Sequence, residues 1–463
     1  MSEHWWDESL SYSARTDVGM RRSNNQDSHC AAPASSMRIW SARGHLFIVA
    51  DGMGAHAAGE KASRMAVDTV EQSYLKRLSE SPADALRSSI LEAHDAIKRK
   101  GDSDPSFRDM GTTCDALAIL PGKAYVGHVG DSRVYRIRDR AIEQLTFDHS
   151  LVWEVKYLPS VRDAYRNAEN VPKNVITRSL GPTENLEVDV EGPFETRPGD
   201  AFLMCSDGLS GQLDDSEIGQ IVEIFKPEEA TESLINLANL RGGPDNSTVI
   251  VARVLSDPSP EEIEREIKSK SKKYEKREPL SPMAIVALIA AIALLALGAI
   301  LCCASGSTAK PAAPTEAAES APASAARSND NVALPLGIGS LVLAAVCGGL
   351  FCFLGRRTLF GVDAKRAEDL NPRGKAPYVR ASAAPTAEFG NKIASMCDEL
   401  CVALKDKGER FAPDWKGVDK ARAQAKEAAH RGDFAAATRA NMSVINYMMG
   451  ELRKYAEKQK KQG

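Results

Sequence analysis

Two long stretches without a charged residue constrain this chain more than any other feature. They cover residues 283–304 and 332–354 and are 22 and 23 residues long. A helix needs about 20 apolar residues to cross the hydrocarbon core of a bilayer. Two buried core helices are the alternative, but uncharged runs of this length are rare in the cores of soluble proteins. The chain is therefore predicted to contain two transmembrane helices.

The charged residues around these spans predict their orientation. Seven basic residues lie within 265–277, before the first span, and seven more lie within 356–380, after the second. The Ala-, Pro- and Ser-rich segment 305–331 between the spans has only Lys310 and Arg327. The positive-inside rule then places both ends of the chain in the cytoplasm and this flexible linker outside. We expect a cell-membrane protein with two spans.

The chain thus divides into soluble and membrane parts. The predicted segments are a soluble domain (8–254), a basic juxtamembrane linker (255–282), the first transmembrane helix (283–304), a flexible extracytoplasmic linker (305–331), the second transmembrane helix (332–354), a basic linker (355–385) and a helical tail domain (386–463). The net charge of −4 argues against a nucleic-acid binder. The nine cysteines show no repeated spacing, which argues against a disulfide framework or a zinc site.

The two soluble parts differ in their hydrophobic patterns. In the first, short apolar β-rich runs such as 46–50, 116–120 and 201–205 alternate with helical patterns such as 62–78. Strands that follow one another directly, with helices grouped between them, favour an α+β domain built on antiparallel sheets. In the tail, apolar residues recur every three to four positions from residue 388 onwards. This spacing predicts a small bundle of about three helices.

Five aspartates lie in short loops beside the apolar runs of the first domain. They are Asp27, Asp51, Asp131, Asp207 and Asp245. Aspartate beside glycine or asparagine is ordinary turn chemistry, so each one alone would be interpreted as a turn. Together they suggest a site, because a carboxylate at the edge of a core is costly unless it is paired or bound to metal. Carboxylate clusters favour Mg²⁺ or Mn²⁺, and two such ions suit the hydrolysis of phosphate esters.

These aspartates belong to eight sequence blocks that occur in a fixed order. The blocks are Thr16-Asp17-x-Gly19-x-x-Arg22-x-x-Asn25-Gln26-Asp27, Val49-Ala50-Asp51-Gly52-Met53-Gly54, Gly59-Glu60-x-Ala62-Ser63, Gly111-Thr112-Thr113, Gly130-Asp131-Ser132-Arg133, Ile176-Thr177-Arg178-Ser179-Leu180-Gly181, Ser206-Asp207-Gly208-Leu209 and Asp245-Asn246-x-Thr248. The set resembles the bacterial metal-dependent protein serine/threonine phosphatases of type 2C. The resemblance covers slightly more than half of the chain and excludes the hairpin and the tail.

The resemblance implies a fold and an activity. The fold is a sandwich of two antiparallel β-sheets flanked by helices. The activity is hydrolysis of phosphoserine and phosphothreonine on proteins by a water activated between two Mn²⁺ or Mg²⁺ ions, with a third ion in some members. Together with the two predicted transmembrane helices, this activity predicts a membrane-tethered phosphatase that acts on cytoplasmic phosphoproteins, including a cellular serine/threonine kinase.

The resemblance also implies roles for the metal-binding residues. Asp51 would bridge the two ions, and the Gly52 carbonyl would be a further ligand. Asp207 and Asp245 would bind the first ion. Asp27 would contribute on the side of the second ion.

Further positions match the family residue by residue. Asp131, together with Asp207, matches the site of the third, weaker ion. Arg22 matches the arginine that binds the substrate phosphate, whereas its neighbour Arg21 would be solvated. Asn246 would orient its loop, and the region 150–174 matches the variable flap that frames the substrate.

Two departures from the family pattern concern the loop after Asp51. Many eukaryotic members have a histidine after the Asp-Gly pair, assigned as the acid that protonates the leaving group, and this chain has Met53 there. Ala55 replaces a common glycine. No side-chain general acid is therefore named, because the lone histidines His56 and His149 are more often structural residues.

Two other classes of function stay open at this point. One is a catalytically silent scaffold that keeps the fold as a binding module, although Asp51, Asp207 and Asp245 are all present. The other is a membrane adaptor that acts through its tail, with the phosphatase as a regulator. We expect the tail to fold on its own as a small helical module for protein contacts rather than catalysis, with its own acidic phosphatase domain as one candidate for such a contact.

Overall fold

The computed structural model describes residues 9–54, 57–158, 161–162, 171–172, 175–256, 378–405, 411 and 413–462. Both predicted transmembrane spans and the linker between them lie outside these residues. Within the described part of the chain, no helix is both long and apolar enough to cross a membrane. The membrane topology therefore stays a prediction.

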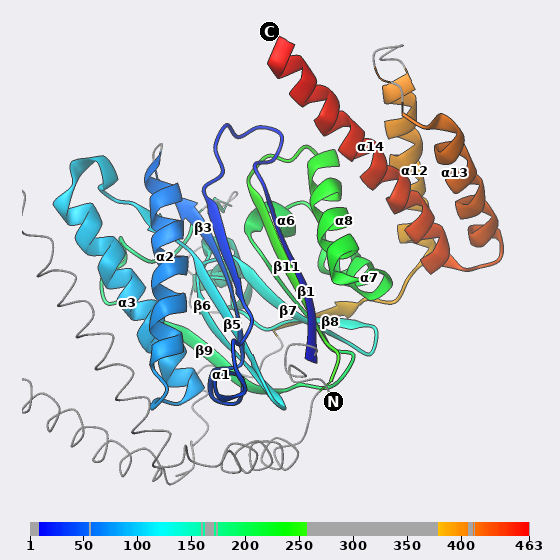
Figure 1. Ribbon diagram of the computed structural model, residues 1–463. Coiled ribbons are helices and arrows are strands. Elements are labelled where there is room, and N and C mark those ends of the chain that lie inside the picture. The colour runs from blue at the N-terminus through cyan, green and yellow to red at the C-terminus, as the bar shows by residue number, and fades with distance from the viewer. Residues whose placement is uncertain are drawn as a thin grey trace, which may run out of the picture. The chain divides into compact units, whose positions relative to one another are not determined.

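The first domain is built on two antiparallel β-sheets (Figure 1). One sheet has the strand order β1-β11-β10-β7-β8-β12, and the other has the order β2-β3-β5-β6-β9 with β4 paired to β3. The strands are β1 (Leu10–Asp17), β2 (Asp27–Ala32), β3 (His45–Met53), β4 (Gly111–Thr112), β5 (Cys114–Leu120), β6 (Lys123–Val129), β7 (Arg133–Arg138), β8 (Ala141–Gln144), β9 (Asp189–Glu195), β10 (Ala201–Cys205), β11 (Ser247–Val254) and β12 (Val379–Ser382). This confirms the predicted α+β class.

Side-chain alternation along the strands creates a core on each face of the sheets. In β3, Phe47 and Val49 pack between the two sheets, whereas Leu46 and Ile48 face the outer helices. The long apolar run of β3 is explained by this burial on both faces, because successive side chains of a strand point to opposite sides.

Helices cover the outer faces of both sheets. Helices α2 and α3 lie over the β2–β9 sheet, and α7 and α8 lie over the β1–β12 sheet (Figure 1). The helices of this domain are α1 (Met37–Arg43), α2 (Ala57–Lys76), α3 (Pro82–Ser103), the 3₁₀ turn η2 (Pro105–Phe107), α4 (Leu151–Tyr157), α6 (Asp207–Ser210), α7 (Asp215–Ile224) and α8 (Pro227–Leu240).

The tail forms the predicted helices and packs on the phosphatase-like domain. Its helices are α12 (Ala387–Lys405), α13 (Trp415–His430) and α14 (Phe434–Gln462). Their apolar faces belong to the same buried cluster as Ile218 and Ile221 of α7 and Leu234 of α8. The tail is thus continuous with one core of the first domain, which differs from the expected separate module. We call the contact of α12 and α14 with α7 and α8 the tail interface.

Strand β12 is the largest difference from the sequence-based prediction. It lies within the segment 355–385 that we interpreted as a basic linker, and it pairs antiparallel with β8 from Val379 opposite Gln144 to Ser382 opposite Ala141. The pattern Val-Arg-Ala-Ser is short and half polar. A short polar strand at a sheet edge has little hydrophobic signal, so its partner decides its structure.

Candidate active site

The five predicted aspartates lie where strands of the two sheets end. Asp51 lies in β3, directly opposite Asp27 at the start of β2. Asp207 begins the short helix α6 directly after β10, and Asp245 lies two residues before β11. Asp131 follows β6 and precedes β7. We call these five residues the aspartate cluster.

Electrostatic interactions show that the structure brings these carboxylates together. Burial, followed by the charges of Asp27, Asp207, Asp131 and Asp245, raises the pKa of Asp51 well above its usual value. Burial raises the pKa of Asp27 to about 7, even though Thr248 and Ser206 donate hydrogen bonds to its Oδ2 atom at 2.6 and 2.7 Å. Mutual repulsion of this kind is relieved by a cation.

Asp131 and Asp207 show the same effect. Burial, and then the charge of Asp207, raises the pKa of Asp131 to about 7. Burial and the charge of Asp245 raise the pKa of Asp207. The cluster therefore carries more negative charge than its protein surroundings neutralise.

The donor set fits a hard divalent cation. Asp27 Oδ1 and Asp131 Oδ1 are buried without a hydrogen-bond partner in the described part of the chain, and an oxygen in that position is suited to a metal ligand. Nevertheless, no three His, Cys, Asp or Glu side chains among the described residues already form a group that could hold a metal ion. Two of the aspartates bond to protein donors instead, Asp27 to Ser206 and Thr248 and Asp245 to Arg22. The ligand assignments stay predictions.

Two threonines fix the backbone of Asp51. The Thr113 hydroxyl accepts a hydrogen bond from the Asp51 amide at 2.8 Å, and the Thr112 hydroxyl donates to the Asp51 carbonyl at 2.8 Å. The family pattern contains Gly111-Thr112-Thr113 but predicts no role for these residues. The missed signal is their type, since a pair of hydroxyls can bind both the amide and the carbonyl of one residue.

Gly52 lies in a close backbone contact. A Cβ atom at Gly52 would lie 2.1 Å from the Gly59 carbonyl oxygen, so a larger residue would push apart β3 and the start of α2. The two glycines therefore allow the loop after Asp51 to pass close to α2. Ala55 and His56, which follow in this loop, lie outside the described residues.

Arg22 lies at the exposed side of the aspartate cluster. Its guanidinium group donates to Asp245 Oδ2 at 2.7 Å, and its side chain is 52% exposed. The hydrogen bond to Asp245 raises the pKa of Arg22, and the charges of Asp51 and Asp207 add to this effect. An exposed arginine that faces several carboxylates can exchange one anionic partner for another.

Asn246 connects the loops that surround Arg22. Its side-chain oxygen accepts a hydrogen bond from the Gln26 amide at 2.8 Å. Its amide nitrogen donates to the carbonyls of Val18 and Asn24 at 2.9 and 3.0 Å. This agrees with the predicted role of Asn246 in orienting its loop.

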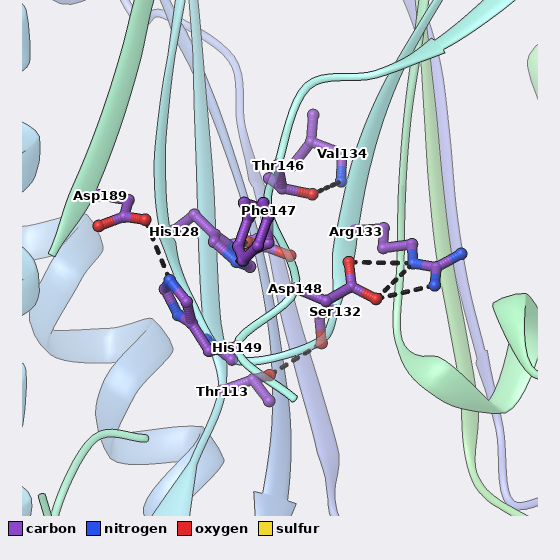
Figure 2. Close-up of polar contacts among 12 residues, drawn as sticks. Thr113, His128, Ser132, Arg133, Val134, Thr146, Phe147, Asp148, His149 and Asp189 are labelled. Atoms are coloured by element: carbon purple, nitrogen blue, oxygen red, sulfur yellow. Dashed lines mark hydrogen bonds and ion pairs between the residues drawn. The ribbon is translucent and has the colours of Figure 1, made fainter. Parts of the chain in front are cut away.

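His149 is part of a buried polar network that includes Asp189 (Figure 2). Its Nδ1 accepts from the Gly130 amide at 3.1 Å, and its Nε2 lies 3.0 Å from Asp189 Oδ2. Burial lowers the pKa of His149 to about 4. A neutral histidine held on both nitrogens positions the loop before Asp131. This agrees with the prediction that His149 is a structural residue.

The same network supports the loop from its other side (Figure 2). The hydroxyls of Thr113 and Ser132 lie 2.9 Å apart, and Arg133 donates to both carboxylate oxygens of Asp148. A hydrogen-bonded path thus leads from Asp51 through Thr113 to the Asp131 loop.

A cleft of about 660 Å³ opens beside Asp27. Asn25, Glu60 and Arg64 are among its lining residues. It is large enough for part of a peptide and mostly polar, so it is the space next to the aspartate cluster that a substrate segment can enter.

Comparisons with known proteins cover the domain that contains the aspartate cluster. Residues 20–239 match the family described as protein phosphatase 2C. The protein phosphatase PhpP of Streptococcus pneumoniae is 37% identical over 246 residues, which cover 52% of this chain and 96% of that protein. The serine/threonine protein phosphatase PstP of Mycobacterium tuberculosis is 32% identical over 250 residues, 53% of this chain and 45% of that protein.

Solved structures cover the same region. The M. tuberculosis serine/threonine phosphatase PstP/Ppp has 34% identity and a TM-score of 0.44, over 53% of this chain and 99% of that one. A catalytic domain of PstP in complex with two manganese ions has 34% identity and a TM-score of 0.42, again over 53% and 99%.

The family match and the curated relatives PhpP and PstP identify the chain as a phosphatase. The chain belongs to the protein phosphatase 2C family of metal-dependent serine/threonine protein phosphatases.

Proposed function

We propose that this phosphatase is tethered to the inner face of a membrane and releases phosphate from phosphoserine and phosphothreonine on cytoplasmic proteins, including a cellular serine/threonine kinase. The observation that carries the catalytic part is the aspartate cluster, in which burial and then the charges of neighbouring carboxylates raise the pKa values of Asp51 and Asp131. Such a set of oxygen ligands favours Mn²⁺ or Mg²⁺ over softer metals.

The family pattern supports a division of the ligands between the ions. Asp51 bridges two ions, and the Gly52 carbonyl is a further ligand. Asp207 and Asp245 bind the first ion. Asp27 serves the second ion, and its free Oδ1 atom supports this role. When bound, the ions supply an activated water as nucleophile and neutralise negative charge on the phosphoryl group.

Asp131 and Arg22 complete the proposed site. Asp131, whose Oδ1 atom is buried without a partner among the described residues, serves a third, weaker ion together with Asp207. Arg22 exchanges its partner Asp245 for the substrate phosphate, because its planar guanidinium group can donate two parallel hydrogen bonds to phosphate oxygens.

The substrate enters from the cleft beside Asp27. Asn25 and Arg64 offer hydrogen-bond donors to a polypeptide there, and Glu60 offers an acceptor. The substrate is therefore a flexible phosphorylated segment whose flanking residues lie in this cleft, with its phosphate directed toward Arg22.

Membrane tethering is supported by the uncharged runs at 283–304 and 332–354 and by the basic residues on their outer sides. A cysteine introduced at Ser320 should react with an impermeant thiol reagent in intact cells. One introduced at Ser395, which lies on α12, should react only after the cells are opened. The reverse labelling pattern would contradict the proposed topology.

The catalytic proposal is tested on the full chain in detergent or nanodiscs, because the tail shares a core with α7 and α8. The protein should release phosphate from a phosphothreonine peptide in Mn²⁺ or Mg²⁺, and excess EDTA should abolish this activity until Mn²⁺ is restored. Full activity in EDTA, or activity with zinc alone, would exclude the proposed Mn²⁺ or Mg²⁺ site.

A further inference from the structure

The tail contains a groove of its own, which we call the tail groove. Helix α14 packs against both α12 and α13 (Figure 1), and a groove of about 370 Å³ lies between the three helices. All the residues that line it belong to these helices, and none comes from α7 or α8. The tail groove is therefore separate from the tail interface. Its volume is in the range of ligand-binding pockets, ~300–1,000 Å³.

Small residues line much of the tail groove. They are Gly390 and Ala394 on α12 and Ala425 and Ala429 on α13. Because these side chains end at Cβ or earlier, the backbone of a second polypeptide can come close to both helices. The lining residues of α12 run from Gly390 to Asp398. This distance is about 12 Å along the helix and matches about four residues of an extended peptide.

An ion pair connects α12 and α13 within the tail groove. Arg422 of α13 donates a hydrogen bond from Nε to Asp398 Oδ1 at 3.0 Å and a second one from Nη2. Asp398 is the one acidic residue among the described residues that line the groove. Its charge is therefore already neutralised by Arg422.

The charge that remains on the groove wall is positive. Lys426 lies one turn after Arg422 on α13, and His430 lies one turn further on the same face. Both are exposed, and neither has an acidic partner in the described part of the chain. The tail domain 386–463 also has 15 Lys and Arg residues against 11 Asp and Glu residues. Such a surface attracts an acidic segment.

Asn441 contributes a polar group from α14 at the buried side of the tail groove. It is only 6% exposed and lines the groove. Its side-chain amide forms no hydrogen bond with another described residue. A buried amide without a partner costs free energy, so this side chain is suited to a ligand. An Asn amide offers a donor and an acceptor, which match the carbonyl and the N–H of a peptide backbone.

We propose that the tail groove binds an extended acidic segment of a partner protein. Asn441 pairs with the main chain of this segment, and Lys426 pairs with one of its carboxylates. The small residues of α12 and α13 leave room for the bound backbone. The tail groove shares no residue with the aspartate cluster, so this binding needs neither metal nor catalysis.

The test measures peptide binding to the full chain in detergent with EDTA. The probes are two pools of fluorescein-labelled peptides of about eight residues, one drawn from Asp, Glu, Ala, Ser and Val, the other with Lys in place of both acids. The acidic pool should bind at least about fivefold more tightly than the basic pool, and high salt should reduce this preference.

Three variants locate the binding on the tail groove. Lys426→Glu should weaken binding of the acidic pool by about tenfold or more, because it replaces attraction by repulsion. Lys420→Glu is the matched control, since it makes the same charge change at an exposed position of α13 that does not line the groove. Asn441→Leu keeps the side-chain volume, removes the amide and should weaken binding by about fivefold.

Several results would overturn the proposal. They are equal binding of the two pools, equal weakening by Lys426→Glu and Lys420→Glu, and wild-type binding by Asn441→Leu. If Asn441→Leu does not fold, Ala394→Leu fills the groove from α12 and should abolish binding, and unchanged binding in that variant would overturn the proposal instead.

A different occupant would give a different result. If neither pool binds and Ala394→Leu dissociates a dimer of the wild-type chain, the groove belongs to a second copy and the proposal is overturned. Because binding is measured without metal, a wild-type chain that releases no phosphate would reject the proposed function and leave the binding result unchanged.

Discussion

The aspartate cluster and the tail interface both contain buried charged or polar groups. They differ in whether these groups are paired with other groups of the protein. In the tail interface, Glu217 is bound by Arg241 and by Lys392 of α12, each at 2.6 Å. In the aspartate cluster, burial and then the charges of four other carboxylates raise the pKa of Asp51. In the tail interface, protein cations neutralise the charge of Glu217. In the aspartate cluster, negative charge remains for a ligand to neutralise.

This difference separates stability from function. Asn236 of α8 donates to Asn446 and accepts from Arg453, both on α14, so these three polar side chains are paired beside an apolar centre. Such a region contributes to the free energy of unfolding. The aspartate cluster costs free energy in the absence of cations, as active sites commonly do. Substitutions in the two regions should therefore have opposite effects.

The largest expected effect is on catalysis, from Asp51→Asn. This substitution keeps the shape of the side chain and removes the charge that would bridge the ions, so kcat should fall by about 10³-fold or more. Because it also removes repulsion, the metal-free protein should be as stable as wild type or more stable. Phosphate release and urea unfolding in EDTA measure the two effects.

Asp102→Asn, at an exposed position of α3, is the control for this change. The predicted loss of catalysis without loss of stability would be contradicted if Asp51→Asn retained activity, or if it lost activity only because it unfolded.

In the tail interface, Ile445→Ala should lower stability and leave the catalytic rate nearly unchanged, which is the reverse of the effect expected for Asp51→Asn. Ile445 is fully buried in the core that α14 shares with α7 and α8. Removing its side chain should lower the free energy of unfolding by about 2–5 kcal/mol, through lost burial and a residual cavity. The rate on p-nitrophenyl phosphate per folded molecule should stay within about twofold.

Val402→Ala provides the matched control, since Val402 is 62% exposed on α12. A loss of intrinsic rate as large as that of Asp51→Asn would show that the two regions are not separable.

The contribution of the tail interface to the free energy of unfolding should depend on pH through Glu217. Burial alone would raise its pKa, but the bonds from Arg241 and Lys392 dominate and lower it to about 2. Because the pKa is lower in the folded state, the stabilisation is complete above about pH 4.5 and is lost as the pH falls toward 2. Glu217→Gln should lower stability at pH 7 by on the order of 2 kcal/mol and flatten this acid dependence. Unfolding curves between pH 3 and pH 7 measure both; an unchanged slope would count against the assignment.

The smallest expected effect is a change in KM that should differ between two neighbouring arginines beside the aspartate cluster. Arg22→Ala should raise KM for a phosphopeptide by about tenfold with a smaller loss of kcat, because it removes a phosphate contact. Arg21→Ala should change neither by more than about twofold. Equal effects of the two substitutions would argue against Arg22 as the phosphate ligand.

The sequence predicted the catalytic half of this structure well, and for a physical reason. Strands such as β3 and β10 are buried on both faces and appear as continuous apolar runs, and the aspartates lie at or near strand ends, although Asp51 lies inside β3 and Asp27 begins β2 rather than lying in loops. The tail helices were predicted from their apolar faces, but a periodicity does not name the surface that covers a face. The partner of these helices is α7 and α8, which only the structure shows.

Positions that depend on distant contacts could not be predicted. Strand β12 has too few apolar residues to signal a strand, and Tyr378, just before it, contacts Phe147 and Glu191, more than 180 residues away in the sequence. Thr112 and Thr113 were recognised as a pattern, whereas their bonds to the Asp51 backbone needed coordinates.

The most direct test of the account is a calorimetric titration of the EDTA-stripped full chain with Mn²⁺, followed by thermal unfolding at each concentration. The aspartate cluster predicts at least two bound ions per chain, with a Tm that rises with Mn²⁺ because binding relieves the repulsion around Asp51. Asp51→Asn should lose most of this binding and of the rise in Tm. A wild-type chain that binds no Mn²⁺, or an Asp51→Asn variant that binds it equally, would contradict the account.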